Sequence, residues 1–90
     1  MKNTYQLESI YSTQKSFYGK AVVDVLDNGH KILTSYNTDV CELDENNNII
    51  EIGYYSRTTA RHINEFLMQH GHNKMTKKEI ENFNKIENIF

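Results

Sequence analysis

Three histidines lie close together in the second half of the sequence, and they are the first residues to test for metal chemistry. They are His62, His70 and His72, and Glu65 follows about one helical turn after His62. Zinc favours imidazole nitrogens and carboxylates that converge on one point. However, His62 and His70 are eight residues apart, which is more than two turns of a straight helix. The spacing favours histidines at the surface or at a helix end, and we expect no metal and no cofactor.

Hydroxyl and thiol groups are the next candidates for chemistry. Ser56, Thr58 and Thr59 are followed by His62, and a hydroxyl beside an imidazole can become a nucleophile. No strained Gly-x-Ser-x-Gly turn surrounds them, and hydroxyls before a helix are what an N-cap requires. Cys41 is expected in the middle of a strand, as a small core residue. A chain this short offers little volume for a pocket, so we expect no enzyme.

Five cationic side chains cluster around the expected starts of two helices: Arg57, Arg61, Lys74, Lys77 and Lys78. Tyr54 and Tyr55 precede them and could stack on the bases of single-stranded nucleic acid. The alternative is a solvated helix face beside tyrosines at the edge of a small core. A formal charge of −2 and a pI of about 6.0 favour this alternative, although a local patch can act despite the net charge.

The element that must position most of these residues is a helix expected over residues 54–71. Its apolar residues recur at helical spacing and form one stripe: Ala60, Ile63, Phe66, Leu67 and His70. Ser56 or Thr58 can serve as its N-cap, and Gly71 can end it. Its opposite face is expected to carry Arg61, Asn64, Glu65 and Met68.

Alternating apolar and polar residues before this helix predict an antiparallel sheet. We expect strands at residues 17–26, 30–36, 39–43 and 49–55. The N-terminal residues 1–16 fit one helical turn at Leu7, Ile10 and Tyr11 equally well, but we favour an extended segment that ends near residue 13 and can add a fifth strand. Asn28-Gly29 favours a tight hairpin turn, Asn37-Thr38 a second turn, and residues 44–48 a loop. In the third of these strands, Val40 is expected on the face opposite Cys41. The residues expected to face the helix are Ala21, Val23, Ile32 and Ile52.

A second helix is expected after a short connection. Thr76 and Glu79 have the spacing of a capping box, in which each side chain bonds the backbone amide of the other residue. Its apolar stripe contains Ile80, Phe83, Ile86 and Phe90. We therefore expect this helix at the surface with one face docked.

Composition limits the class of protein. Ninety residues make one domain, which buries roughly 60–65% of the surface of the unfolded chain. One cysteine excludes an intrachain disulfide, and a lone thiol without an apolar N-terminal stretch is typical of a reducing cytoplasm. No stretch approaches the roughly 20 apolar residues of a membrane span.

Three segments carry a resemblance to known proteins. They are Ser16-Phe17-Tyr18-Gly19-Lys20-Ala21, the segment Leu33 to Thr38, and YYSRTTARHINEFL at residues 54–67 followed by Gln69 and Gly71. In this order they resemble a family of short, uncharacterised proteins carried by phages and plasmids of AT-rich Gram-positive bacteria. The resemblance covers roughly residues 10–72. It implies a mobile-element accessory protein and brings no assigned activity.

The sequence thus predicts a single α+β domain over residues 1–90, in which one amphipathic helix covers a meander of four to five strands. The predicted function is a non-enzymatic phage or mobile-element protein that binds and modulates a host protein, such as an anti-CRISPR that inhibits host defence. The alternative is a small nucleic-acid-binding regulator. We expect a cytoplasmic monomer or homodimer without membrane association. Tyrosine and arginine dominate interface energetics, and the expected partner-binding residues are Tyr54, Tyr55, Arg57, Arg61 and Glu65.

Overall fold

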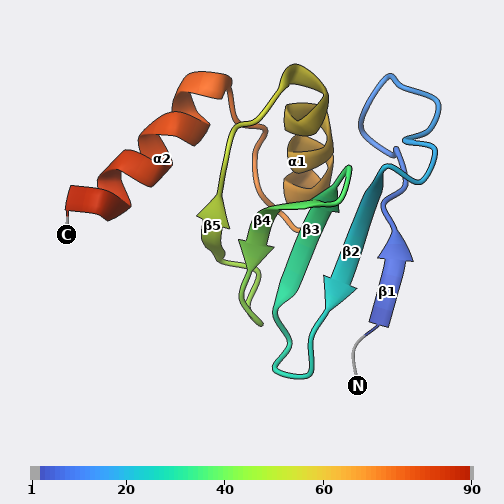
Figure 1. Cartoon of the computed structure of the whole chain (residues 1–90), viewed down its shortest axis with the longest axis horizontal. Coiled ribbons are helices and arrows are strands. Elements are labelled where there is room, and N and C mark those ends of the chain that lie inside the picture. The colour runs from blue at the N-terminus through green and yellow to red at the C-terminus, as the bar shows by residue number, and fades with distance from the viewer. Residues whose placement is uncertain (1–2, 90) are drawn as a thin grey trace.

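The structure, a computed structural model, describes residues 3–89 of the chain and the side chains of residues 3–83. Within that range five strands precede two helices (Figure 1): β1 Asn3–Gln6, β2 Ala21–Val25, β3 Lys31–Ser35, β4 Thr38–Leu43, β5 Ile49–Ile52, α1 Arg57–Gln69 and α2 Lys77–Ile89. The strands form one sheet in chain order, and every neighbouring pair is antiparallel. The predicted α+β meander is confirmed. Its fifth strand is β1, which ends at Gln6 and not near residue 13 as expected.

Two tight turns set the register of the sheet. Between β2 and β3, the Leu26 N–H bonds the His30 carbonyl at 2.9 Å, and Gly29 has a φ of 89°. Between β3 and β4, Tyr36 and Asn37 have positive φ values of 52° and 78°, as a two-residue type I′ turn requires. The sequence placed this second turn one residue later, because Asn37 is the residue that tolerates positive φ best.

The inner face of the sheet differs from the prediction in β3 and β4. Leu33, and not Ile32, is fully buried, because Leu33 pairs with the buried Val23 and so lies on the same face. Val40 and Cys41 are both buried, although successive residues of a regular strand face opposite sides. A shift of register in the ladder between β3 and β4 accounts for this pair. The predictions for Ile32 and Val40 were therefore wrong.

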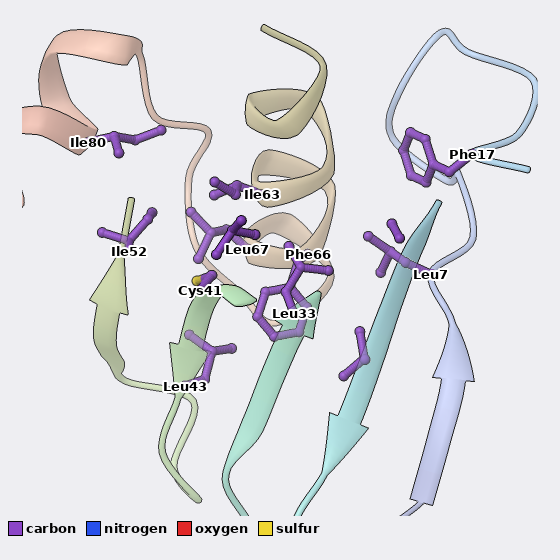
Figure 2. Packing of buried hydrophobic residues seen from close by; sticks show 13 residues of the cluster. Leu7, Phe17, Leu33, Cys41, Leu43, Ile52, Ile63, Phe66, Leu67 and Ile80 are labelled. Carbon is purple, nitrogen blue, oxygen red and sulfur yellow. The ribbon is translucent and has the colours of Figure 1, made fainter. Parts of the chain in front are cut away.

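Helix α1 covers the inner face of the sheet. Ile63, Phe66 and Leu67 are fully buried, whereas Ala60 is half-buried. Figure 2 shows Phe66 next to Leu33 of the sheet and Leu67 and Ile63 farther along α1, within the same buried cluster. The centre of the core thus lies between α1 and the sheet, and Phe17 and Ile80 extend it at its edges.

Local hydrogen bonds fix both ends of α1 as the sequence predicts. The Thr59 N–H donates to Ser56 Oγ at 3.1 Å, which makes Ser56 the N-cap. Gly71 has a φ of 88°, and the His72 N–H bonds the Leu67 carbonyl at 2.9 Å. This closing bond is that of a Schellman motif, which pairs carbonyls left over at a helix end.

Helix α2 begins with the predicted capping box and docks beside β5 (Figure 1). The Thr76 N–H donates to Glu79 Oε1 at 3.0 Å, and the Glu79 N–H donates to Thr76 Oγ1 at 3.2 Å. Ile80 is fully buried, and Phe83 is partly buried against the core. The predicted contributions of Ile86 and Phe90 lie outside the described side chains. Neither helix has the length and apolar character needed to cross a bilayer, over the part of the chain that the structure describes.

Candidate partner-binding groove on helix α1

The carboxylate of Glu65 holds the segment between β1 and β2 against α1. Glu65 Oε1 accepts three consecutive backbone N–H groups, from Ile10 at 3.1 Å, Tyr11 at 2.8 Å and Ser12 at 2.9 Å. Only 1% of Glu65 is exposed. The expectation that Glu65 lies on an exposed helix face is wrong, because residues 8–16 fold over this part of α1 (Figure 1).

A second hydrogen-bonded side chain completes this contact. Gln69 Nε2 donates to Glu65 Oε2 at 2.7 Å and to the Glu8 carbonyl at 2.8 Å. Both carboxylate oxygens of Glu65 therefore have donors, as a buried charge requires. The segment also bonds within itself, since Ser9 Oγ donates to the Gln14 carbonyl and the Gln14 N–H donates to Ser12 Oγ. It is consequently an ordered wall beside the helix.

A groove of about 240 Å³ lies between this wall and α1. We call it the α1 groove, and its lining residues are Tyr11, Ser12, Thr13, Arg61, Asn64, Glu65, Met68 and Lys74. The Asn64 amide fixes the chain next to Lys74, because it donates to the Met75 carbonyl at 3.0 Å and accepts the Met75 N–H at 2.7 Å. Three separate segments therefore enclose one small concave surface.

Large apolar side chains and cationic side chains are exposed around the α1 groove. Ile10 is 62% exposed and Tyr11 is 58% exposed, so the wall presents two large side chains to solvent. Arg61 and Lys74 are also exposed. Among the residues that the structure describes, neither cation has a carboxylate partner. This combination of an aromatic residue, an arginine and a concave surface is typical of the energetic centre of a protein interface.

The structure brings together only two of the five predicted partner-binding residues. Arg61 and Glu65 both line the α1 groove, and Glu65 supports the wall from within. Arg57 is exposed in the first turn of α1. Tyr54 is half-buried against the core, and the Lys77 Nζ lies 5.2 Å from the centroid of its ring.

Tyr55 belongs to a different surface. Its ring lies over Gly53, where an added Cβ would meet the Tyr55 Cε2 atom at 2.9 Å. It lines a groove of about 480 Å³ along β4 and β5, with the carboxylates of Asp39, Glu42 and Glu51. Tyr55 and Arg61 therefore line separate grooves, and the prediction of one continuous patch does not hold for this pair.

A buried polar cluster joins α1 to β3. Ser35 Oγ lies 2.8 Å from His62 Nδ1 and 3.2 Å from Thr59 Oγ1, and all three residues are buried. The His62 and Phe17 rings pack edge to face, with their centroids 4.7 Å apart. Burial lowers the pKa of His62, because the interior disfavours the charged imidazolium. Although this is a hydroxyl–imidazole pair, it is closed to a substrate in this conformation.

The remaining candidates for metal or thiol chemistry have structural partners. His70 Nδ1 lies 2.7 Å from the Phe66 carbonyl, and His72 Nε2 meets the Asn47 carbonyl. Burial raises the pKa of the Cys41 thiol to about 12, far from the thiolate state that reactivity needs. In residues 3–83, no three His, Cys, Asp or Glu side chains gather closely enough to hold a metal ion.

The wall of the groove could not be predicted, because the pattern of residues 1–16 fits a strand and one helical turn equally well. The only available signal was Glu65 itself, an acid flanked on α1 by the buried Ile63 and Phe66. A buried carboxylate must find donors, and the nearest unassigned backbone amides were those of the N-terminal segment.

Comparison with protein families gives one match to this chain. Residues 5–82 match the model of a family of unknown function (DUF8033). This range contains every residue that lines the α1 groove. No curated protein and no solved structure matches the chain.

Proposed function

The chain belongs to the DUF8033 family, and we propose that it is a non-enzymatic protein that binds another protein through the α1 groove. One observation carries the proposal: the exposed Tyr11 lines the groove together with Arg61 and Lys74, which have no carboxylate partner among the described residues. Tyr11 and the equally exposed Ile10 belong to a wall that Glu65 holds in place. A wall that is ordered before binding loses little conformational entropy when a partner docks. Exposed anchors on an ordered wall favour recognition of a folded partner or of a segment of one.

The narrower role remains a prediction from the sequence resemblance. That role is a phage or plasmid accessory protein that inhibits a host protein, such as a defence enzyme. Partner binding by a small domain is compatible with it.

Comparative affinity capture tests the proposal. The wild-type protein and a Tyr11→Ala, Arg61→Ala double variant are immobilised and incubated with lysate of the source organism, and retained proteins are identified by mass spectrometry. We expect a protein that the wild type retains and the double variant loses. An Arg57→Ala variant serves as the control, because Arg57 is exposed on the same helix but does not line the groove.

The variants must be folded for this comparison to count. Tyr11 and Arg61 are exposed, so the double variant should keep the circular dichroism spectrum and should lose at most about 1 kcal/mol of unfolding free energy. If a folded double variant retains the same proteins as the wild type, the proposal is wrong.

The second candidate function is nucleic-acid binding, which the exposed cations at the helix starts favour. Arg57, Arg61, Lys74, Lys77 and Lys78 are all exposed. Contacts to phosphates would release counterions, so binding should weaken steeply as salt increases. A titration with single- and double-stranded DNA and RNA at about 50 mM salt and micromolar protein tests this function, since even non-specific binders are partly bound under those conditions.

A further inference from the structure

We propose that the α1 groove is a carboxylate-recognition site, which receives an aspartate or glutamate side chain from an acidic segment of the partner. The inference rests on the proposed function and adds the chemical class of the partner segment. Four features of the groove carry it: its charge, its hydroxyl donors, the state of its own carboxylate and its size.

Two cations in the groove lack a carboxylate partner among the described residues, although the chain as a whole has more acidic than basic residues. The sequence has 12 Asp and Glu residues against 10 Lys and Arg residues. Even so, Arg61 and Lys74 line one cavity without a carboxylate partner among the residues that the structure describes. A guanidinium presents paired N–H donors that match the two oxygens of a carboxylate. Two unpaired cations at one concave surface therefore complement a single acidic side chain.

Hydroxyl groups on the wall add neutral donors to these cations. Ser12 lines the groove, and its Oγ accepts the Gln14 N–H at 3.1 Å, a bond that does not use the hydroxyl's own proton. Thr13 is exposed on the same wall. A hydroxyl donates one hydrogen bond and accepts others, and both residues line the groove together with Arg61 and Lys74.

The resident carboxylate of Glu65 does not compete for these donors. Its Oε1 atom accepts three backbone N–H groups and its Oε2 atom accepts the Gln69 amide. Because it is 1% exposed and fully bonded, it leaves the two cations available. The amide of Asn64 is similarly committed to the Met75 backbone. The free polar groups of the groove are then cationic or hydroxyl.

The size of the groove selects a side chain over a free metabolite. Its volume is about 240 Å³, below the roughly 300–1,000 Å³ typical of small-molecule sites. A carboxylate side chain fits this space, while the exposed ring of Tyr11 supplies apolar area for the flanking residues of the same segment. Tyr11 and the cations therefore act on one peptide segment.

A peptide titration monitored by NMR tests the proposal. The probe is a capped octapeptide that alternates glutamate and leucine, and its control replaces each glutamate by glutamine. We expect the glutamate peptide to shift the backbone amide signals of Tyr11, Ser12 and Thr13 in a saturable manner. The glutamine peptide should bind at least about tenfold more weakly, since each charge-assisted contact is worth about that factor.

Matched variants locate the charge effect. Arg61→Gln with Lys74→Gln should weaken binding of the glutamate peptide at least about tenfold. Arg57→Gln with Lys78→Gln changes the net charge equally, but these exposed residues do not line the groove. This control should change the affinity less than about threefold, as screened distant charges do.

Each contrary outcome has a defined meaning. Equal binding of the two peptides, or equal loss in both double variants, overturns carboxylate recognition. If oligothymidylate or inorganic phosphate shifts the same amides with higher affinity than the glutamate peptide, the groove binds phosphate instead and the proposal is wrong. If retention of the captured partner still requires Tyr11 and Arg61 but the glutamate peptide does not bind, carboxylate recognition is wrong while the proposed protein-binding function is supported.

Discussion

Replacing Glu65 by alanine should destabilise the protein more than any other change on the outer side of α1. The substitution removes the acceptor of the Ile10, Tyr11 and Ser12 N–H groups. A hydrogen bond to a charged group contributes roughly 1.5–3 kcal/mol, so three such bonds set an upper limit of about 9 kcal/mol. The wall can open and expose its amides to water, which recovers most of that energy. We therefore expect a loss of about 3 kcal/mol, out of the roughly 5–15 kcal/mol typical of small domains.

Two measurements check this expectation. Urea denaturation gives the change in unfolding free energy directly, and a loss of this size should lower the Tm by roughly 12–24 °C in a domain of this length. Hydrogen exchange should then show faster exchange of the amides of residues 10–12. The amides of the central strands should still exchange only through global unfolding, at a rate that matches the unfolding free energy of the variant.

A matched control separates this effect from the loss of any helical glutamate. Glu81→Ala removes an exposed glutamate from α2, and it should change the unfolding free energy by at most about 0.5 kcal/mol. If Glu65→Ala is as stable as Glu81→Ala, the wall is not held by this carboxylate, and the reasoning on a preformed groove is refuted.

Further predictions concern the core, the helix end and the effect of pH. Phe66→Ala removes a fully buried ring and should lower the unfolding free energy by about 3–5 kcal/mol in urea denaturation. An unchanged Tm would show that the packing of α1 on the sheet does not stabilise the fold. Gly71→Ala meets no atom within 4 Å but retains a φ of 88°, so it should cost about 1–2 kcal/mol for the left-handed backbone alone. Burial lowers the pKa of His62 below its usual 6.5, so the folded state binds this proton less readily than the unfolded chain. The stability that neutral His62 contributes should therefore be fully present above pH 6.5 and be lost as the pH decreases through the lowered pKa. His62→Gln should remove this part of the pH dependence of the unfolding free energy, and an unchanged pH profile in the variant would contradict the assignment to His62.

Features that depend on a few neighbouring residues could be predicted from the sequence. The Ser56 cap, the Gly71 terminus and the reciprocal bonds of Thr76 and Glu79 are all observed. Each depends on bonds that reach no more than a few residues along the chain. The order of β2 to β5 in the sheet could also be predicted, because short turns between strands join antiparallel neighbours.

Features that depend on register or on distant segments could not be predicted. Ile32 and Leu33 are both large and apolar, and the register of β3 against β2, in which Leu33 pairs with the buried Val23, decides which one faces α1. Val40 is buried because of an irregularity in the ladder that its own sequence does not mark. Glu65 reads as an exposed helical residue until residues 10–12 fold over it, a contact that spans more than half of the chain.

The most direct test of the central claim is the affinity of the captured partner protein for the Arg61→Ala variant. The claim is that the α1 groove binds a partner, and Arg61 is an exposed residue of that groove with no carboxylate partner among the described residues. Isothermal titration calorimetry should show a loss of about 2 kcal/mol, or roughly thirtyfold in Kd, with an unfolding free energy within about 0.5 kcal/mol of the wild type. An unchanged Kd, or an equal loss in the Arg57→Ala control, would contradict the claim.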